Sequence, residues 1–134
     1  MSLEKMAGWS FLVVDDEPDN VEIVADTLTY HGLEVRTASN GVEGMAVLDS
    51  FTPSLILLDL SMPEMDGWAM RQKVKDNPAT AAIPIVALSA HAMAGDRERI
   101  LAAGFDGYLS KPVNLLSLLE DIWTALEEQG NAPE

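Results

Sequence analysis

The stretch Phe11–Asp16, with the sequence Phe-Leu-Val-Val-Asp-Asp, is an apolar run that ends on two carboxylates. The same arrangement recurs at Leu55–Asp59, Ile85–Ser89 and Gly107–Lys111, where the runs end on an aspartate, a serine and a lysine. Continuous apolar runs of this length are typical of buried strands in parallel sheets. Because the carboxyl ends of parallel strands share one edge of the sheet, we expect these polar residues to form one site.

Segments with helical periodicity separate the strands. The first expected helix begins near Pro18 and stops at Gly32, and the second is capped by Asn40. The third follows Gly67 and ends by Asn77. The fourth spans about Met93–Ala103 with Gly95 inside it, and the fifth spans about Leu115 to Glu128. The second of them should turn Val42, Met45 and Ala46 toward the core. The last should turn Leu115, Leu119, Ile122 and Leu126 inward. Strands at Glu34–Thr37 and Gly107–Leu109 are expected at the two edges. This alternation predicts an α/β fold with a doubly wound parallel sheet.

Length and composition favour a single globular domain. The chain has 134 residues, is 48% hydrophobic and contains no cysteine, so it has neither a disulfide framework nor a thiolate metal site. We expect a domain at residues 10–128, preceded by an N-terminal extension at 1–9 and followed by a polar tail at 129–134. No stretch approaches the roughly 18 apolar residues of a membrane span, and no signal peptide is recognisable. We therefore expect a cytoplasmic protein.

The formal net charge of −14 excludes several classes of partner. Phosphate backbones and anionic membrane surfaces would be repelled, so no direct nucleic-acid or membrane binding is expected. The few basic residues are scattered along the chain and predict no broad basic patch. The acidic surface instead favours protein partners that present basic patches.

Asp15, Asp16 and Asp59 would supply three carboxylates to the shared edge of the sheet. Hard oxygen ligands without histidine or cysteine suit Mg²⁺, or Mn²⁺, better than Zn²⁺. An alternative is that Asp15, Asp16 and Glu17 simply occupy a helix N-terminus, where negative charge is favourable. A third carboxylate at the end of another buried strand favours the metal site.

Asp59 is the best candidate nucleophile, since a carboxylate at the end of a central strand is rigidly held and can form an acyl phosphate. Ser89 and Lys111 could then donate to phosphoryl oxygens. Taken singly, Ser89 is equally well a loop serine and Lys111 a solvated surface lysine. A cis Lys111–Pro112 peptide could aim the lysine inward. Gly67 is interpreted as a residue with positive φ in the loop after Asp59.

Four motifs, in the family's order and spacing, give the chain a family resemblance. They are Leu-Val-Val-Asp15-Asp16-Glu, Leu-Leu-Asp59-Leu-Ser-Met-Pro63-Glu-Met-Asp-Gly67, Ala-Leu-Ser89-Ala and Tyr108-Leu-Ser-Lys111-Pro112. From about Ser10 to Glu128 the sequence resembles the receiver domain of two-component response regulators, the CheY-like family. The resemblance implies a flavodoxin-like (βα)5 fold with strand order 2-1-3-4-5.

The resemblance also implies a function. Asp59 would accept a phosphoryl group from a sensor histidine kinase or a histidine phosphotransfer protein. Mg²⁺ would be held by Asp16, Asp59 and the backbone carbonyl of Ser61, with Asp15 oriented through water. Lys111 and Ser89 would engage the phosphoryl oxygens. Ser89 and Tyr108 would then move together and reshape the face of the fourth helix, fifth strand and fifth helix for a downstream protein target.

Other functions remain open. The chain could be a stand-alone regulator, a phosphorelay intermediate, or a receiver cut from a hybrid kinase or longer regulator, and phosphorylation could drive homodimerisation. An aspartyl-phosphate phosphohydrolase similar to the haloacid dehalogenase group would need an acid/base carboxylate where Ser61 stands. A phosphate-independent interaction domain is disfavoured by the intact Asp16, Asp59, Ser89 and Lys111 set. We expect a signalling switch that promotes its own phosphorylation and dephosphorylation, and not an enzyme acting on another substrate.

Overall fold

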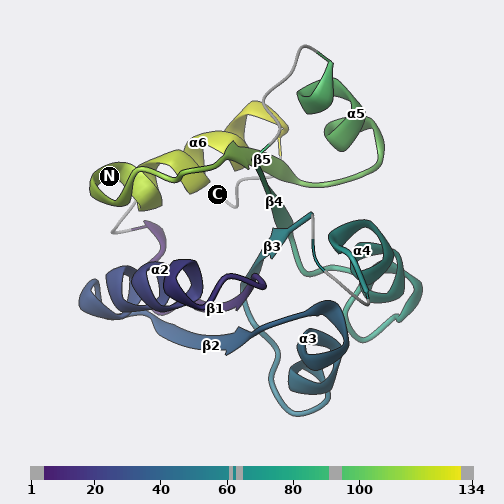
Figure 1. Ribbon diagram of the computed structural model, residues 1–134, viewed down its shortest axis with the longest axis horizontal. Coiled ribbons are helices and arrows are strands. Elements are labelled where there is room, and N and C mark those ends of the chain that lie inside the picture. The colour runs from purple at the N-terminus through teal and green to yellow at the C-terminus, as the bar shows by residue number, and fades with distance from the viewer. Residues whose placement is uncertain (1–4, 61, 63–64, 91–94, 131–134) are drawn as a thin grey trace.

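A five-stranded parallel sheet forms the centre of the computed structural model, which describes residues 5–60, 62, 65–90 and 95–130 (Figure 1). Its strand order is β2-β1-β3-β4-β5. The strands are β1 Ser10–Val14, β2 Glu34–Ala38, β3 Leu55–Asp59, β4 Ile85–Ser89 and β5 Gly107–Ser110. The predicted fold class and strand order are confirmed, with β2 and β5 at the edges.

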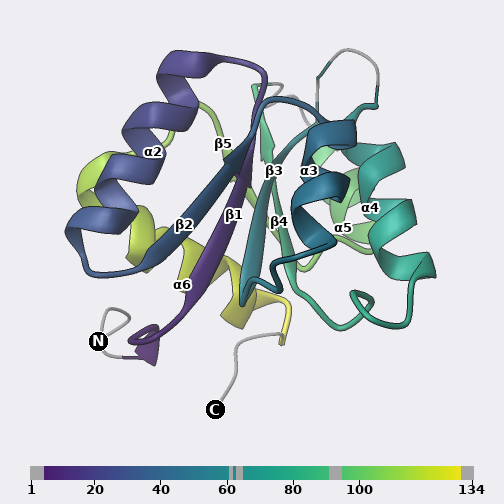
Figure 2. The same ribbon diagram turned by 90° about the horizontal axis from the view of Figure 1, so that it is seen from below.

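Helices cover both faces of this sheet. They are α2 Pro18–Tyr30, α3 Gly41–Leu48, α4 Gly67–Asp76, α5 Asp96–Ala102 and α6 Leu118–Glu128, the last preceded by the 3-10 turn η1 Leu115–Ser117. Figure 2 shows α2 and α6 on one face and α3, α4 and α5 on the other. None of the described helices is long and apolar enough to cross a bilayer.

The three central strands divide the core into two layers. Phe11 and Val13 of β1 point into one hydrophobic cluster, together with α2 and α6. Leu12 and Val14 point into the other, under α3, α4 and α5. Side chains alternate across a strand, so a strand covered on both faces must be apolar at every position. This explains why the deciding apolar runs are continuous.

Two helix ends match their sequence signals. The amides of Gly32 and Leu33 donate to the carbonyls of Thr29 and Leu28 at 2.9 and 3.2 Å, closing α2 around a glycine with φ of 84°. The side chain of Asn40 accepts a hydrogen bond from the Glu43 amide at 2.8 Å and caps α3.

Of the three apolar residues expected to face the core from α3, only Met45 packs against it, and it is partly buried. Val42 is 52% exposed and Ala46 is also exposed, whereas Gly41 and Gly44 are buried. A Cβ atom at Gly44 would stand 2.8 Å from Cε of Met70 on α4. The buried glycines of α3 leave room for the end of the Met70 side chain, so α3 packs closely against α4.

The sequence predicted that Gly95 lies inside a helix, and this prediction was wrong. It has φ of 93° and directly precedes α5, which begins at Asp96. The proposed start at Met93 lies outside the described residues. Glycine is placed here because a left-handed conformation is strained for other residues.

Residues 5–9 fold back onto the core. Met6 is completely buried within the α2/α6 cluster. The ring of Trp9 lies 5.9 Å from that of Trp123 on α6, between their centroids. The side chain of Trp123 was absent from the expected stripe of the last helix, yet it is 95% buried because this segment covers it.

Candidate functional site

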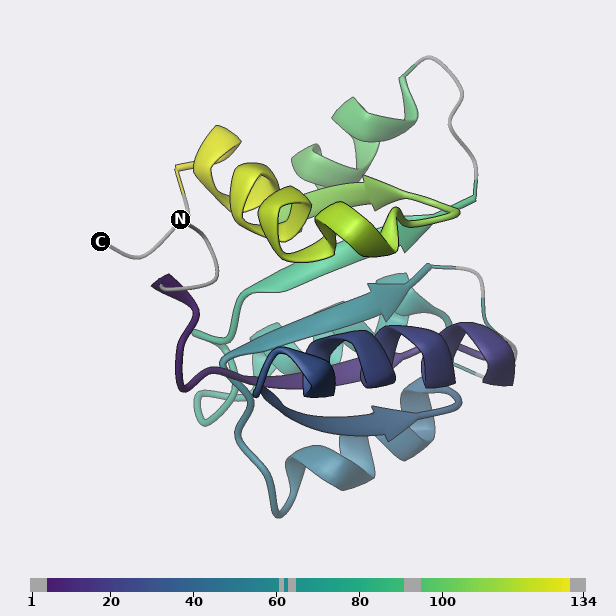
Figure 3. The same ribbon diagram turned by 90° about the vertical axis from the view of Figure 1, so that its left-hand side faces the viewer.

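The register of the sheet brings the predicted site residues to one edge. Val14 of β1 pairs with Leu58 of β3, so Asp15 and Asp59 follow at the same level. Ser89 ends β4 beside Asp59, and the Lys111 amide donates to the Ser89 carbonyl at 2.8 Å. The strands are all parallel, and the arrowheads that can be seen in Figure 3 point the same way, so the carboxyl ends of the strands share one edge. Asp15, Asp59 and Ser89 are each at most 5% exposed.

The Lys111 ammonium joins the carboxylates of this edge. Its Nζ lies 2.9 Å from Oδ2 of Asp15, 3.4 Å from Oδ2 of Asp59 and 3.7 Å from Oε1 of Glu17. The Lys111 side chain is only 11% exposed. It is therefore not a solvated surface lysine but a counter-ion that makes two buried carboxylates tolerable. The Lys111–Pro112 peptide is cis.

The pKa of Lys111 is raised above its ordinary value of 10.5. Burial by itself lowers this pKa, but the hydrogen bond and charge of Asp15, followed by those of Asp59, more than offset it. Lys111 is consequently a cation throughout the physiological pH range. It can attract further negative charge that is placed on either carboxylate.

Consecutive carboxylates follow β1. Asp15, Asp16 and Glu17 each offer one oxygen atom such that all three oxygens lie within 4.8 Å of one another. Asp15 is buried and also accepts a hydrogen bond from the Glu17 amide at 3.0 Å, whereas Asp16 and Glu17 are exposed. This oxygen-rich donor set is compatible with a hard divalent cation. Glu17 is a member of the group that the expected ligand set did not include.

Gly67 is required by close packing rather than by a positive φ, so the sequence interpretation was wrong. A Cβ atom here would lie 2.4 Å from the carbonyl oxygen of Asp59 and 2.8 Å from Cα of Leu60. Its φ is not in the left-handed range. Asp66 accepts a hydrogen bond from the Ala69 amide at 2.8 Å and starts α4. Together these residues place the beginning of α4 directly against the end of β3.

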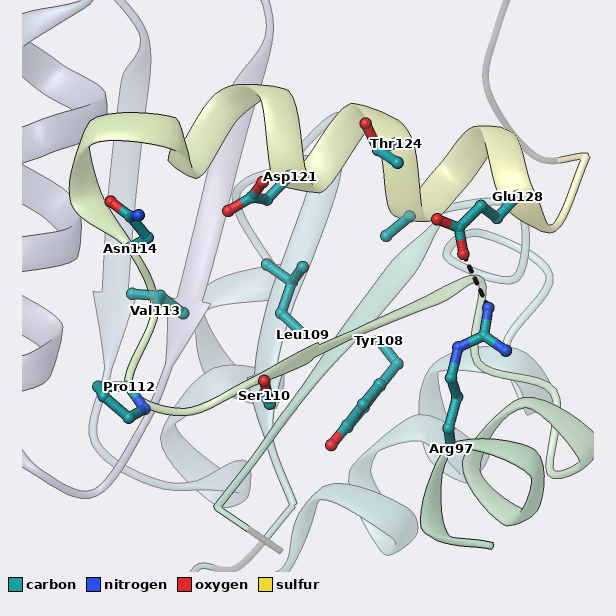
Figure 4. Close-up of a pocket in the computed structure, with 11 residues that line it drawn as sticks. Arg97, Tyr108, Leu109, Ser110, Pro112, Val113, Asn114, Asp121, Thr124 and Glu128 are labelled. Atoms are coloured by element: carbon teal, nitrogen blue, oxygen red, sulfur yellow. Dashed lines mark hydrogen bonds and ion pairs between the residues drawn. The ribbon is translucent and has the colours of Figure 1, made fainter. Parts of the chain in front are cut away.

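Tyr108 of the edge strand β5 lines a pocket. The pocket has a volume of about 430 Å³ between β5, α5 and α6. In Figure 4, Arg97 of α5 reaches across it to Glu128 of α6, at 2.8 Å between Nη2 and Oε2. Burial, and then the charge of Asp96, raise the pKa of Tyr108 above 10.0. Ser61, the expected carbonyl ligand, lies outside the described residues.

Comparison with known proteins identifies the family. The model of the response regulator receiver domain matches residues 11–123. The chain belongs to the response regulator receiver family. It is thus a CheY-like receiver domain of two-component signal transduction, a family of signalling switches.

Curated relatives include both short regulators and sensor kinases. This receiver domain is 34% identical over 113 residues to the polar-differentiation response regulator DivK of Brucella anthropi, covering 84% of this chain and 92% of that protein. It is 38% identical over 111 residues to the sensor histidine kinase RcsC of Salmonella typhi, covering 83% of this chain but 12% of the kinase. It also resembles an uncharacterised 14.6 kDa protein of Leptolyngbya boryana, with 37% identity over 117 residues, 87% of this chain and 89% of that one.

Solved structures agree. The chemotaxis protein CheY4 of Vibrio cholerae superposes with a TM-score of 0.81 at 30% identity, covering 90% of this chain and all of that one. A CheY-like receiver domain from Methanospirillum hungatei gives a TM-score of 0.78 at 29% identity, covering 92% and 98% of the two chains.

Proposed function

We propose that Asp59 of this receiver domain accepts a phosphoryl group from a phosphorylated histidine of a sensor kinase or phosphotransfer protein. The observation that carries the proposal is the Lys111 ammonium, which lies within 3.4 Å of the buried Asp59 carboxylate and is itself almost buried. A fixed cation beside a carboxylate at the end of a central strand can neutralise the charge that a phosphoryl group adds.

Phosphoryl transfer to Asp59 exchanges one bond to phosphorus for another. An oxygen of Asp59 forms a bond to phosphorus while the P–N bond of the phosphohistidine breaks, and the imidazole nitrogen keeps the electron pair. In dephosphorylation, water attacks phosphorus and the bond between phosphorus and the Asp59 oxygen breaks. This releases inorganic phosphate and restores the Asp59 carboxylate. Lys111 stays protonated throughout, because its raised pKa disfavours proton loss.

Mg²⁺, or Mn²⁺ in its place, fits the donor set of this edge. We assign Asp16, Asp59 and the Ser61 carbonyl as its ligands, with Asp15 acting through water. The cluster of hard carboxylate oxygens at Asp15, Asp16 and Glu17 supports a divalent cation of this kind. When bound, the cation would neutralise charge on the phosphoryl oxygens.

Ser89 and Tyr108 are proposed to carry the signal outward. Ser89 lies at the end of β4, next to the strand that bears Asp59, and its hydroxyl can donate to a phosphoryl oxygen. Tyr108 is half-buried on the neighbouring strand β5, beside the pocket between α5 and α6. A phosphoryl group that draws Ser89 inward would change the space available to Tyr108, and with it the surface offered to a downstream protein or a second copy.

The phosphodonor is proposed to dock between α2 and the segment 111–116. A cavity of about 200 Å³ there is lined by Asp15 and Lys111 at one end and by Ile23 and Leu115 at the other. Leu116 just beyond it is fully exposed, at 101%. Helices α2 and α6 carry seven Asp or Glu residues and no Lys or Arg. An apolar ridge with a basic rim would therefore fit this surface, consistent with a cytoplasmic protein partner rather than nucleic acid or membrane.

Labelling with acetyl phosphate tests the proposal. Intact mass should show one added phosphoryl group in the presence of Mg²⁺ and none with EDTA, and hydroxylamine should remove it. The conservative variant Asp59→Asn should take up none. Leu116→Gln should label normally with acetyl phosphate, because a small donor needs no docking, but should accept phosphate more slowly from a phosphorylated kinase. Absence of labelling in folded protein with Mg²⁺ would leave a phosphate-independent interaction domain.

A further inference from the structure

The charges of the chain are divided unevenly between its two sides. Five of the eight Lys and Arg residues lie on α4 and α5, at Arg71, Lys73, Lys75, Arg97 and Arg99. Residues 66–106 contain five basic and five acidic residues, so the net charge of −14 falls entirely on the rest of the chain. An acidic partner would be repelled elsewhere and meets least opposition at these two helices.

Two arginines and two aromatic rings form a row that links α4 to α5, two helices that cover the same face of the sheet (Figure 2). The Arg99 guanidinium lies over the Trp68 ring at 5.3 Å, and Trp68 meets Phe105 edge to face at 5.4 Å. The Arg71 guanidinium lies over the Phe105 ring, 5.7 Å from its centroid. We call Trp68, Arg71, Arg99 and Phe105 the α4–α5 row.

Arg71 has donors to spare. Among the residues that the structure describes, no carboxylate lies within ion-pair distance of it, although the chain has 22 acidic residues. Its buried Nε also lacks an acceptor within the described part of the chain. Space for the guanidinium depends on Gly104, where a Cβ atom would collide with it. The buried Nε is out of reach of a partner, but the terminal amino groups of the guanidinium have no carboxylate partner among the described residues and can donate to an external acceptor.

Arg99 retains similar capacity. Among the described residues it forms an ion pair only with Asp96, at 3.5 Å between Nη2 and Oδ1, and its side chain is 67% exposed. The Trp68 ring holds the guanidinium in place, which reduces the conformational entropy lost when it binds an anion. Trp and Arg are also the residue types that contribute most to the energy of protein interfaces.

We propose that the α4–α5 row binds an acidic segment of a partner protein, with Arg71 and Arg99 donating to its carboxylates beside the Trp68 ring. The two arginines supply the charge complementarity, and the partly exposed Trp68 ring supplies apolar contact area. Phe105 is only 3% exposed and packs against Trp68 without offering surface of its own. This surface is separate from the Asp59 edge and from the proposed phosphodonor surface, so its binding does not depend on phosphoryl transfer.

NMR of the folded chain with a short poly-L-glutamate peptide tests the proposal at low ionic strength. Three tryptophans give three indole N–H signals, and Trp68→Phe assigns the one from Trp68. The peptide should shift the Trp68 signal and leave those of Trp9 and Trp123 in place. Arg99→Gln and Arg71→Gln should each weaken binding about tenfold, as expected when one charge-assisted contact is lost.

Lys73→Gln is the matched control, because it removes the same charge from α4 without touching the row. It should weaken binding less than about twofold, as for an exposed charge. Asp59→Asn should bind like the parent, which separates this proposal from the phosphoacceptor function. Equal losses in Lys73→Gln and Arg99→Gln, or no shift of Trp68, would overturn the proposal. A Trp68 shift with a single-stranded oligonucleotide but not with polyglutamate would overturn it too.

Discussion

At the scale of single residues, the site depends on two features that act on Asp59. Gly67 lets the beginning of α4 lie directly against the backbone carbonyl of Asp59, and the Lys111 ammonium lies beside the Asp59 carboxylate. Both effects require a particular side chain at one position. Substitutions there should therefore have larger effects than substitutions at neighbouring positions.

Gly67→Ala should reduce the free energy of unfolding by about 2 kcal/mol, because the new Cβ would meet backbone atoms that cannot move aside cheaply. Gly44→Ala is the matched control, since the nearest atoms to its Cβ would be side-chain atoms of Met70 and Val14 and not backbone atoms. At position 44 the helix propensity of alanine offsets the crowding, so the free energy of unfolding should change by less than about 1 kcal/mol. Urea unfolding measures both. Equal losses would show that backbone contact at Gly67 is not the cause.

Lys111→Met should destabilise the protein at neutral pH by about 3 kcal/mol, since it leaves Asp15 and Asp59 buried without their cation. A raised lysine pKa stabilises the fold below the unfolded-state value of 10.5 and loses this effect as pH rises through the folded-state value. The stability difference between parent and variant should therefore shrink toward about pH 11. Tyr108→Phe controls for the other group with a raised pKa. A difference that stays constant with pH would contradict the account.

At the scale of elements, the strands were predictable and some helix faces were not. Each central strand is buried on both faces, and its continuous apolar run marks it without reference to the rest of the chain. The orientation of α3 could not be read in this way, because its contact with α4 is made by glycines that hydropathy does not detect. The 3-10 turn η1, which precedes α6, begins after Asn114, whose side chain accepts a hydrogen bond from the Leu116 amide at 3.0 Å.

The same contrast holds for the site. The residues at strand ends were identified because topology alone brings them together, as the register of β1, β3 and β4 confirms. The direct Asp15–Lys111 ion pair and the approach of Glu17 were missed, since they depend on side-chain direction. A third consecutive acid after Asp15 and Asp16 was the available signal for Glu17.

Residues 5–9 act as an additional element that closes the α2/α6 side of the core. Met6→Ala should lower the free energy of unfolding by about 2–4 kcal/mol, because Met6 is completely buried. Lys5→Ala removes only the exposed cation at 5.1 Å from the Trp123 ring and should cost about 0.5 kcal/mol. Thermal unfolding of the two variants compares these losses. If Met6→Ala were no worse than Lys5→Ala, this segment would not belong to the core.

At the scale of the whole molecule, a net charge of −14 makes cations stabilising, and the Asp15–Asp16–Glu17 group should make Mg²⁺ more effective than salt alone. MgCl2 should raise the melting temperature more than NaCl of equal ionic strength. The free energy of unfolding should rise by about 2.7 kcal/mol when the Mg²⁺ concentration is a hundred times its dissociation constant. In Asp16→Asn the two salts should act alike. A parent protein that cannot distinguish them would argue against a specific site.

The central claim is that Asp59 carries the phosphoryl group, and borohydride trapping tests it most directly. Borohydride reduces an aspartyl phosphate to homoserine, which marks the modified residue permanently. After treatment with acetyl phosphate and Mg²⁺, peptide sequencing by mass spectrometry should place homoserine at position 59 and leave Asp15 and Asp16 unchanged. Homoserine at position 15 or 16, or at none of the three positions in protein that had gained a phosphoryl group, would contradict the account.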